Sequence, residues 1–326
     1  MEKMNHPIYL SVPGGLVRTD AVLAIAERIQ QSNKNIIIQT YDTVQGLQWN
    51  GGRLIVNRLV ADLAPQRLPY DVTVDNLEEA IKRIKRLNER GISFNLTFNN
   101  VFENIDVDDP DGNHLLEQLH DGMNMVTVST RALAAHVRSH YPKYKIVASI
   151  CFVNDTLEKC RKACEDYDLV VMLPEFAYQA ETFSTLPVDK LSFIINDDCF
   201  LFCRRKEHYE ALSRCSLAGN STRGEQELNL RVGSCFSREV RGYREKRPDG
   251  MSKDLCTKIA GIVKKQRVKD EDILPGHHEY NITKAARTEL MQRGVNHFKL
   301  QGRAAADYVY RNAVEEYLER FVRDEL

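Results

Sequence analysis

The sequence lacks several features that would place a protein in a class at once. Its 326 residues carry 45 Lys and Arg against 46 Asp and Glu, a net charge of −1. This balance excludes a chain that is basic overall, although a local basic face stays open. No apolar run approaches the roughly 18 residues that a membrane-spanning helix needs. The segment Met1 to Pro7 is polar, so we expect no secretory signal and a cytoplasmic protein.

Common catalytic motifs are also missing from the sequence. It contains no His-Glu-x-x-His, no Gly-x-Ser-x-Gly and no Gly-x4-Gly-Lys. These absences argue against a zincin, an α/β-hydrolase and a P-loop nucleotide-binding protein. We find no internal repeat and no low-complexity segment.

Short apolar segments alternate with amphipathic segments along the chain, a pattern typical of a parallel α/β fold. The pattern predicts eight strands: Ile8 to Val12, Asn35 to Tyr41, Ser93 to Phe98, Met125 to Val128, Lys145 to Ser149, Leu169 to Leu173, Leu191 to Ile195 and His297 to Leu300. Eight such units in one chain of this length favour a TIM-type (β/α)8 barrel, with a doubly wound sheet as the alternative.

We predict one barrel domain over residues 1–326, interrupted after the seventh strand by a long polar insertion at residues 216–272. Basic residues outnumber acidic ones within residues 238–269. The insertion has two interpretations, a solvated surface or an anion-binding lid over the barrel mouth.

The active site of a TIM barrel lies at the carboxyl ends of its strands. We therefore expect Lys299 and Arg303 to hold negative charge there, or else to form ion pairs that close the barrel end. Polar side chains at other strand ends would orient a substrate, and these are Asn99, Glu175 and Asn196. His208 is either an acid–base group near the mouth or a residue on a helix surface.

Eight cysteines in a reducing compartment are not expected to form disulfides. Cys199 and Cys203 follow a strand end with the spacing Cys-x3-Cys, and Cys215 and Cys235 could complete a set of four thiolates. Four thiolates suit structural zinc or an iron–sulfur cluster, and their irregular spacing favours the cluster over a zinc ribbon. Cys160 and Cys164 share the Cys-x3-Cys spacing but lie within a predicted helix, where we expect small buried apolar side chains.

Two segments resemble the collagenase-like U32 peptidase family. Residues 295–303, Val-Asn-His-Phe-Lys-Leu-Gln-Gly-Arg, resemble its closing strand, although Gln301 stands where the family has glutamate. Residues 194–199, Ile-Ile-Asn-Asp-Asp-Cys, together with Cys203 resemble the strand and cysteine loop of a short, single-barrel branch. Residues 96–99 and 167–171 also fit the family.

The resemblance implies a TIM-like barrel and, as in several members, a 4Fe–4S cluster on four cysteines. By position Cys199 and Cys203 carry over best, then Cys235, with Cys215 as the fourth ligand. Characterised members of this kind support oxygen-independent hydroxylation of RNA bases or of a quinone precursor, while older members are named as peptidases.

Three functions follow as hypotheses. The first is an iron–sulfur oxidoreductase, an oxygen-independent hydroxylase or related modifying enzyme, that acts on a small anionic or nucleobase-containing substrate. The second is a peptidase of the collagenase-like type. The third is a non-catalytic, cluster-bearing subunit of a heteromeric complex. The expected partners are a small anionic molecule and a second subunit or electron donor, without a membrane; nucleic acid stays open.

Overall fold

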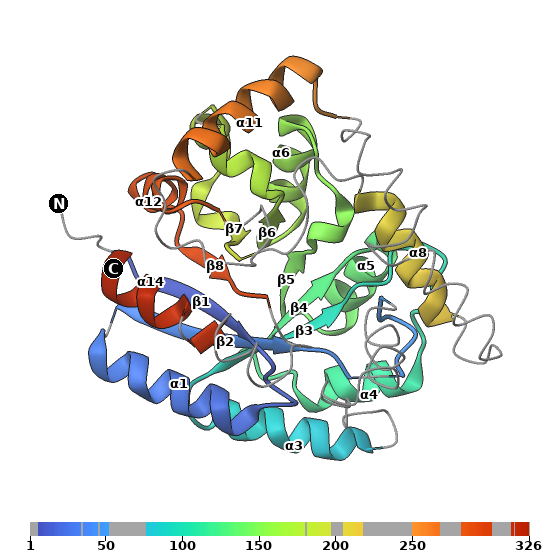
Figure 1. Ribbon diagram of the computed structural model, residues 1–326. Coiled ribbons are helices and arrows are strands. Elements are labelled where there is room, and N and C mark those ends of the chain that lie inside the picture. Colours follow the sequence, from blue (N-terminus) through green and yellow to red (C-terminus); the bar gives the residue numbers. More distant parts are fainter. Residues whose placement is uncertain are drawn as a thin grey trace, which may run out of the picture.

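Eight parallel strands close into a barrel in the computed structural model of the protein (Figure 1). The structure describes residues 6–33, 35–44, 46–51, 76–179, 181–196, 205–217, 250–267, 282–301, 314–315 and 317–325. The strands are β1 (Ile8–Pro13), β2 (Ile36–Asp42), β3 (Ser93–Phe98), β4 (Met125–Val128), β5 (Lys145–Ala148), β6 (Leu169–Met172), β7 (Leu191–Ile194) and β8 (His297–Lys299). Consecutive strands pair in parallel, and β8 also pairs with β1. The predicted TIM-type barrel is confirmed, and the doubly wound sheet is wrong.

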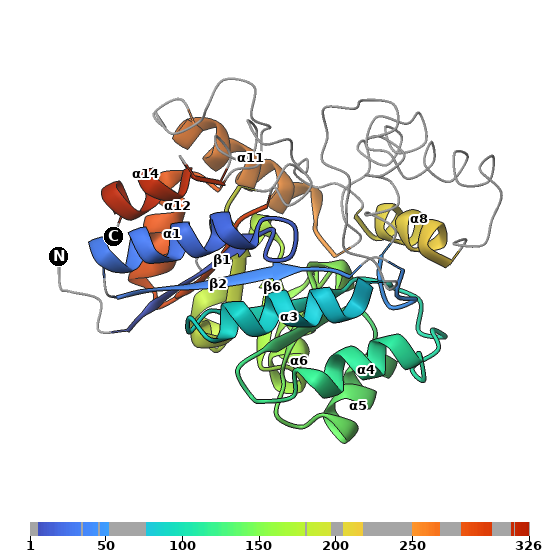
Figure 2. The ribbon, with the colours of Figure 1, turned by 90° about the horizontal axis from the view of Figure 1, so that it is seen from below.

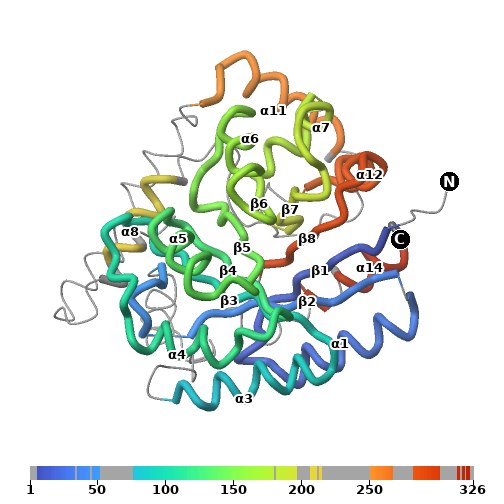
Figure 3. The backbone as a smooth tube through the Cα atoms, turned by 180° about the vertical axis from the view of Figure 1, so that it is seen from behind, coloured from blue at the N-terminus to red at the C-terminus, as the bar shows by residue number. Residues whose placement is uncertain are grey.

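Helices surround this barrel, as the view from behind shows (Figure 3). The α-helices are α1 (Thr19–Ser32), α3 (Leu77–Asn88), α4 (Pro110–Gln118), α5 (Arg131–His140), α6 (Leu157–Asp166), α7 (Thr182–Thr185), α8 (Arg205–Leu217), α11 (Lys253–Arg267), α12 (Lys284–Gln292) and α14 (Tyr317–Glu325). Within the described residues, three short 3-10 helices follow strands or precede them: η2 (Ile150–Phe152), η3 (Pro174–Tyr178) and η4 (Val188–Lys190). No helix in the described part of the chain is both long and apolar enough to cross a membrane.

Local sequence sets where several helices begin. Thr130, Thr156 and Thr283 each accept a hydrogen bond from a backbone N–H in the first turn of α5, α6 and α12. Asp109 does the same for α4, whose first residue is Pro110. These side chains satisfy donors that the start of a helix leaves open, so each loop passes into its helix at a defined residue.

The C-terminal helix α14 lies beside α1 in the outer layer (Figure 2). Phe321 of α14 packs edge-on against Phe298 of β8, with ring centroids 5.7 Å apart. Arg28 of α1 and Glu319 of α14 form an ion pair of 3.0 Å between the two helices. The last helix of the chain thus completes the outer layer beside the first.

Part of the predicted insertion belongs to this outer layer. Helix α11 packs against η3, and Met251, Ile259 and Val263 are buried. The backbone N–H of Gly250 donates to Asp155 at 2.7 Å, which attaches the start of this segment to the loop before α6. Residues 218–249 and 268–272 lie outside the described residues, so the lid over the mouth stays a prediction.

A candidate active site at the barrel mouth

The direction in which each strand side chain points follows from the two apolar clusters of the molecule. A large cluster lies between the strands and the helices, and it includes Val126 and Val128 of β4. A small cluster contains Met125 of the same strand, so alternate residues face the barrel interior. We call this small cluster the apolar half of the interior; its members are Met125, Val147, Leu169, Val171 and Ile194.

The strand register shows which residues share the interior with the apolar half. Asn95 is level with Met125, Thr127 with Val147, and Lys299 with Ile194. The register of the other strands identifies further interior positions that carry polar side chains. We call this set the polar half of the interior; its members are Ser11, Gln39, Tyr41, Asn95, Thr97, Thr127 and Lys299. Most of these come from β1, β2, β3 and β8, while β4 to β7 supply the apolar half.

Hydrogen bonds connect the polar half across strands. Thr127 Oγ1 donates to Asn95 Oδ1 at 2.7 Å, and the hydroxyls of Thr43 and Thr97 lie 2.5 Å apart. The side chains of Asn95, Thr97 and Thr127 are buried. Buried polar groups are costly unless they are hydrogen-bonded, so these pairs make a polar interior compatible with a stable fold.

Lys299 lies at the mouth end of this polar half. Its ammonium nitrogen sits 3.7 Å from the centroid of the Tyr41 ring, a cation–π contact. The Tyr41 hydroxyl donates to the backbone carbonyl of Leu300 at 2.5 Å, which fixes the ring. The half-buried Lys299 side chain is therefore held beside the interior rather than extended into solvent.

Asn99, directly after β3, is oriented by serines from the next two strand ends. Its Oδ1 accepts a hydrogen bond from Ser149 Oγ at 2.9 Å and lies 3.5 Å from Ser129 Oγ. Its Nδ2 donates to no partner within the described part of the chain. Three successive strand ends thus present one oriented amide donor at the mouth, which can bind an acceptor such as a carbonyl, carboxylate or phosphate oxygen.

Asn196, two residues after β7, makes different contacts from Asn99. Its Nδ2 donates to the Gln301 carbonyl at 3.2 Å, and its Oδ1 accepts from the Gln301 backbone N–H at 2.6 Å. These two bonds extend the pairing of β7 and β8 by one step beyond the strands. The structure gives Asn196 a positioning role, bracing the segment that follows Lys299.

Helix α8 brings two further predicted residues to the mouth. It packs against η2, which follows β5, and Ser213 accepts a hydrogen bond of 3.2 Å from the backbone of Val101, just beyond β3. His208 is buried, with its ring 5.7 Å from that of Tyr209, so its interpretation as a helix-surface residue is wrong. Cys215 belongs to the same helix.

Glu175 is almost completely buried in η3, after β6. Helices α11 and α12 both pack against η3, and α12 carries Arg287, which is also buried and donates to the Ile282 carbonyl at 2.6 Å. Glu175 thus lies at a strand end as predicted, in a segment that α11 and α12 cover from the outer layer.

Four of the predicted site residues lie outside the described residues, namely Cys199, Cys203, Cys235 and Arg303. Within the described ranges, no three His, Cys, Asp or Glu side chains gather as a metal site would require. Cys160 and Cys164 are buried in α6, as predicted, and burial raises the pKa of their thiols to about 12 and about 11. They are protonated at neutral pH and act as small apolar residues.

The sequence places Tyr41 and Ser149 at strand ends, but sequence reasoning did not predict the contacts that orient this site. Tyr41 beneath Lys299, and Ser129 and Ser149 around Asn99, lie far from their partners in sequence. A polar residue at alternate positions of an apolar strand, such as Gln39 or Asn95, is the signal that could have revealed the polar half.

No protein-family model and no curated protein matches the sequence. Among solved structures, one described as a U32 peptidase is similar, with a TM-score of 0.42 and 13% sequence identity over 68% of this chain and 81% of that chain. The barrel assignment rests on the strand order seen in this protein.

Proposed function

We propose that this protein is an enzyme that binds a small anionic substrate at the barrel mouth, between Lys299 and Asn99, and modifies it there. The observation that carries the proposal is the Asn99 amide, which serines on two other strand ends orient while its Nδ2 donates to no described residue. An oriented donor at the rim is what a substrate oxygen requires, and Lys299 would supply the charge that favours an anion.

The proposed chemistry is oxidation or reduction with a 4Fe–4S cluster held by Cys199, Cys203, Cys215 and Cys235. The positions of two segments next to the proposed ligands support this cofactor. Asn196, three residues before Cys199, lies at the end of β7, and α8, which carries Cys215, packs over the ends of β3 and β5. When bound, such a cluster would supply electrons, while Lys299 and Asn99 would hold the substrate.

Anaerobic purification with assays for iron, zinc and acid-labile sulfide tests the cofactor. We expect roughly four irons and four sulfides per chain, as one 4Fe–4S cluster requires, and their loss when any proposed ligand is changed to alanine. Cys256→Ser, on α11, is the matched control and should keep the cluster. Zinc without sulfide, or no metal at all, would contradict the proposed cluster. Hydrolysis of peptides by the metal-free protein would favour the peptidase hypothesis instead.

The binding site is tested separately through Asn99→Asp. This change keeps an oxygen to accept from Ser149 and Ser129 but replaces the free amide donor by an acceptor. We expect the fold to survive and the affinity for small carboxylates and nucleoside monophosphates, measured by titration, to fall about tenfold or more. An unchanged affinity for every anion that binds the unmodified protein would exclude Asn99 from the site.

A further inference from the structure

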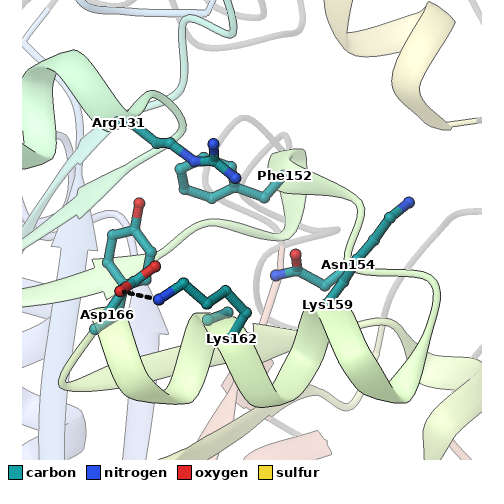
Figure 4. A pocket seen from close by; sticks show the side chains of 8 residues that line it. Arg131, Phe152, Asn154, Lys159, Lys162 and Asp166 are labelled. Carbon is teal, nitrogen blue, oxygen red and sulfur yellow. Dashed lines mark hydrogen bonds and ion pairs between the residues drawn. The ribbon is translucent and has the colours of Figure 1, made fainter.

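A second pocket lies on the flank of the barrel, apart from the mouth. It has a volume of about 220 Å³ and is formed by the start of α5, by η2 with the loop after it, and by α6 (Figure 4). Its lining residues are Arg131, Phe152, Asn154, Lys159, Lys162, Ala163, Asp166 and Tyr167. For scale, a cavity of about 150 Å³ is sufficient to hold benzene.

Of the three basic side chains that line this pocket, two form ion pairs with neighbouring carboxylates. Lys159 pairs with Asp155 at 2.6 Å, and Lys162 pairs with Asp166 at 3.1 Å and with Glu165 at 3.5 Å. The Arg131 guanidinium makes no ion pair or hydrogen bond with any residue that the structure describes. A guanidinium that no described carboxylate engages can bind an anion, and the planar fork of arginine matches a carboxylate.

Two neutral polar groups line the same pocket. The side-chain amide of Asn154 and the hydroxyl of Tyr167 form no hydrogen bond within the described ranges. Burial raises the pKa of Tyr167 to about 12, so its hydroxyl keeps its proton and can donate. Arg131, Asn154 and Tyr167 therefore all have hydrogen-bonding capacity that a ligand could use.

The remaining wall is aromatic and aliphatic. The rings of Phe152 and Tyr167 lie 5.5 Å apart and are tilted by 49°, with Ala163 beside them in the lining. Figure 4 shows the Arg131 side chain reaching across toward Phe152. A flat apolar group placed against Phe152 would bring an attached carboxylate within reach of the guanidinium.

We infer that this flank pocket binds a small aromatic monocarboxylate, with the ring against Phe152 and the carboxylate on Arg131. The site is independent of the mouth, since none of its lining residues belongs to the group around Lys299 and Asn99. Its small volume limits the ligand to about the size of one substituted ring.

Calorimetric titration with benzoate, with benzyl alcohol and inorganic phosphate as comparison probes, tests the inference. We expect benzoate to bind with a dissociation constant on the order of 1 mM, as few non-hydrogen atoms allow, and the other two to bind at least about tenfold more weakly. Equal binding of benzyl alcohol would contradict the anionic part, and equal binding of phosphate the aromatic part.

Variants locate the binding to this pocket. Arg131→Gln should weaken benzoate binding about tenfold or more, since it removes a charge-assisted bond, and Phe152→Leu should also weaken it. Arg161→Gln, on α6 but outside the lining, is the matched control for loss of one positive charge. Arg131→Gln should leave the affinity for nucleoside monophosphates unchanged, which separates this site from the proposed one at the mouth. Full affinity in both Arg131→Gln and Phe152→Leu would overturn the inference.

Discussion

The two halves of the barrel interior are filled differently: one by apolar side chains in contact, the other by polar side chains that hydrogen-bond to one another. In the apolar half, β4 to β7 contribute Met125, Val147, Leu169, Val171 and Ile194, which contact one another. In the polar half, threonine, asparagine, glutamine and lysine side chains occupy the equivalent register and hydrogen-bond across strands.

The difference indicates which half is free to serve a function. Burial of apolar area stabilises the apolar half directly. The polar half contributes little net stability, because its hydrogen bonds replace bonds to water. It does hold Lys299 and Tyr41 in a fixed arrangement beside the mouth. We interpret the apolar half as the part that stabilises the barrel and the polar half as the part that positions functional side chains.

The largest effect is expected from a charge placed in the apolar half. Val147 is 1% exposed and is level with Thr127 across the boundary between the halves. Val147→Asp should lower the free energy of unfolding by about 4 kcal/mol or more, since an isolated buried carboxylate is strongly unfavourable. Urea unfolding measures the loss, with Val147→Ala as the control for lost volume, at about 2 kcal/mol. Equal losses in both variants would mean that the apolar half admits water.

A second prediction concerns the amino end of the interior, where His297 stacks on Tyr9 with ring centroids 4.5 Å apart. Burial, with a smaller contribution from the Lys145 charge, lowers the pKa of His297 from 6.5 to about 4. Between these values the unfolded chain binds the proton and the folded one does not. The free energy of unfolding should therefore fall by up to about 3 kcal/mol as the pH drops from 7 to 4.

His297→Phe, which keeps a ring against Tyr9, should remove this part of the pH dependence. Unfolding measured at several pH values checks it, with exposed His6→Gln as the control for loss of any histidine. The same slope in His297→Phe as in the unmodified protein would show that His297 is hydrated in the folded state.

A third prediction tests whether the polar half is a connected network. Thr127→Val removes the donor to Asn95 and should cost about 1 to 2 kcal/mol, because a buried amide oxygen loses its partner. Adding Asn95→Leu should recover part of that loss, giving a coupling of at least about 0.5 kcal/mol in a double-mutant cycle of unfolding free energies. Strict additivity of the two changes would argue that the pair does not interact.

The frame of the barrel could be predicted closely from the sequence, since strands buried on both faces are short continuous apolar runs. Segments Ser93–Phe98 and Met125–Val128 have the predicted bounds. The acidic run that contains Asp109 and Pro110 is typical of a turn in sequence, yet in the structure it begins helix α4. The positions of Asn99, Asn196 and Lys299 at strand ends were predictable from the fold alone.

The partners of these residues were not predictable, for a physical reason. The contact of Lys299 with Tyr41 joins residues far apart in sequence, and it depends on how β8, β1 and β2 are staggered. The same holds for Asn99 with Ser149. A single sequence fixes which residues are polar, but the register of neighbouring strands decides whether Asn196 braces a loop or faces a ligand.

The smallest effect on stability, and the most informative one about function, is expected from Lys299→Met. Methionine keeps an unbranched apolar stem beside Tyr41 and loses only the ammonium, so the free energy of unfolding should change by less than about 1 kcal/mol, the size of a cation–π contact. Affinity for anionic ligands at the mouth should fall roughly tenfold or more, because charge-assisted bonds are the strong ones. Lys145→Met, at the opposite end of the barrel, is the matched control for loss of one positive charge. If both variants lower anion affinity equally, the effect comes from net charge. If Lys299→Met instead costs several kcal/mol, Lys299 holds the barrel end closed, and the polar half is as structural as the apolar one.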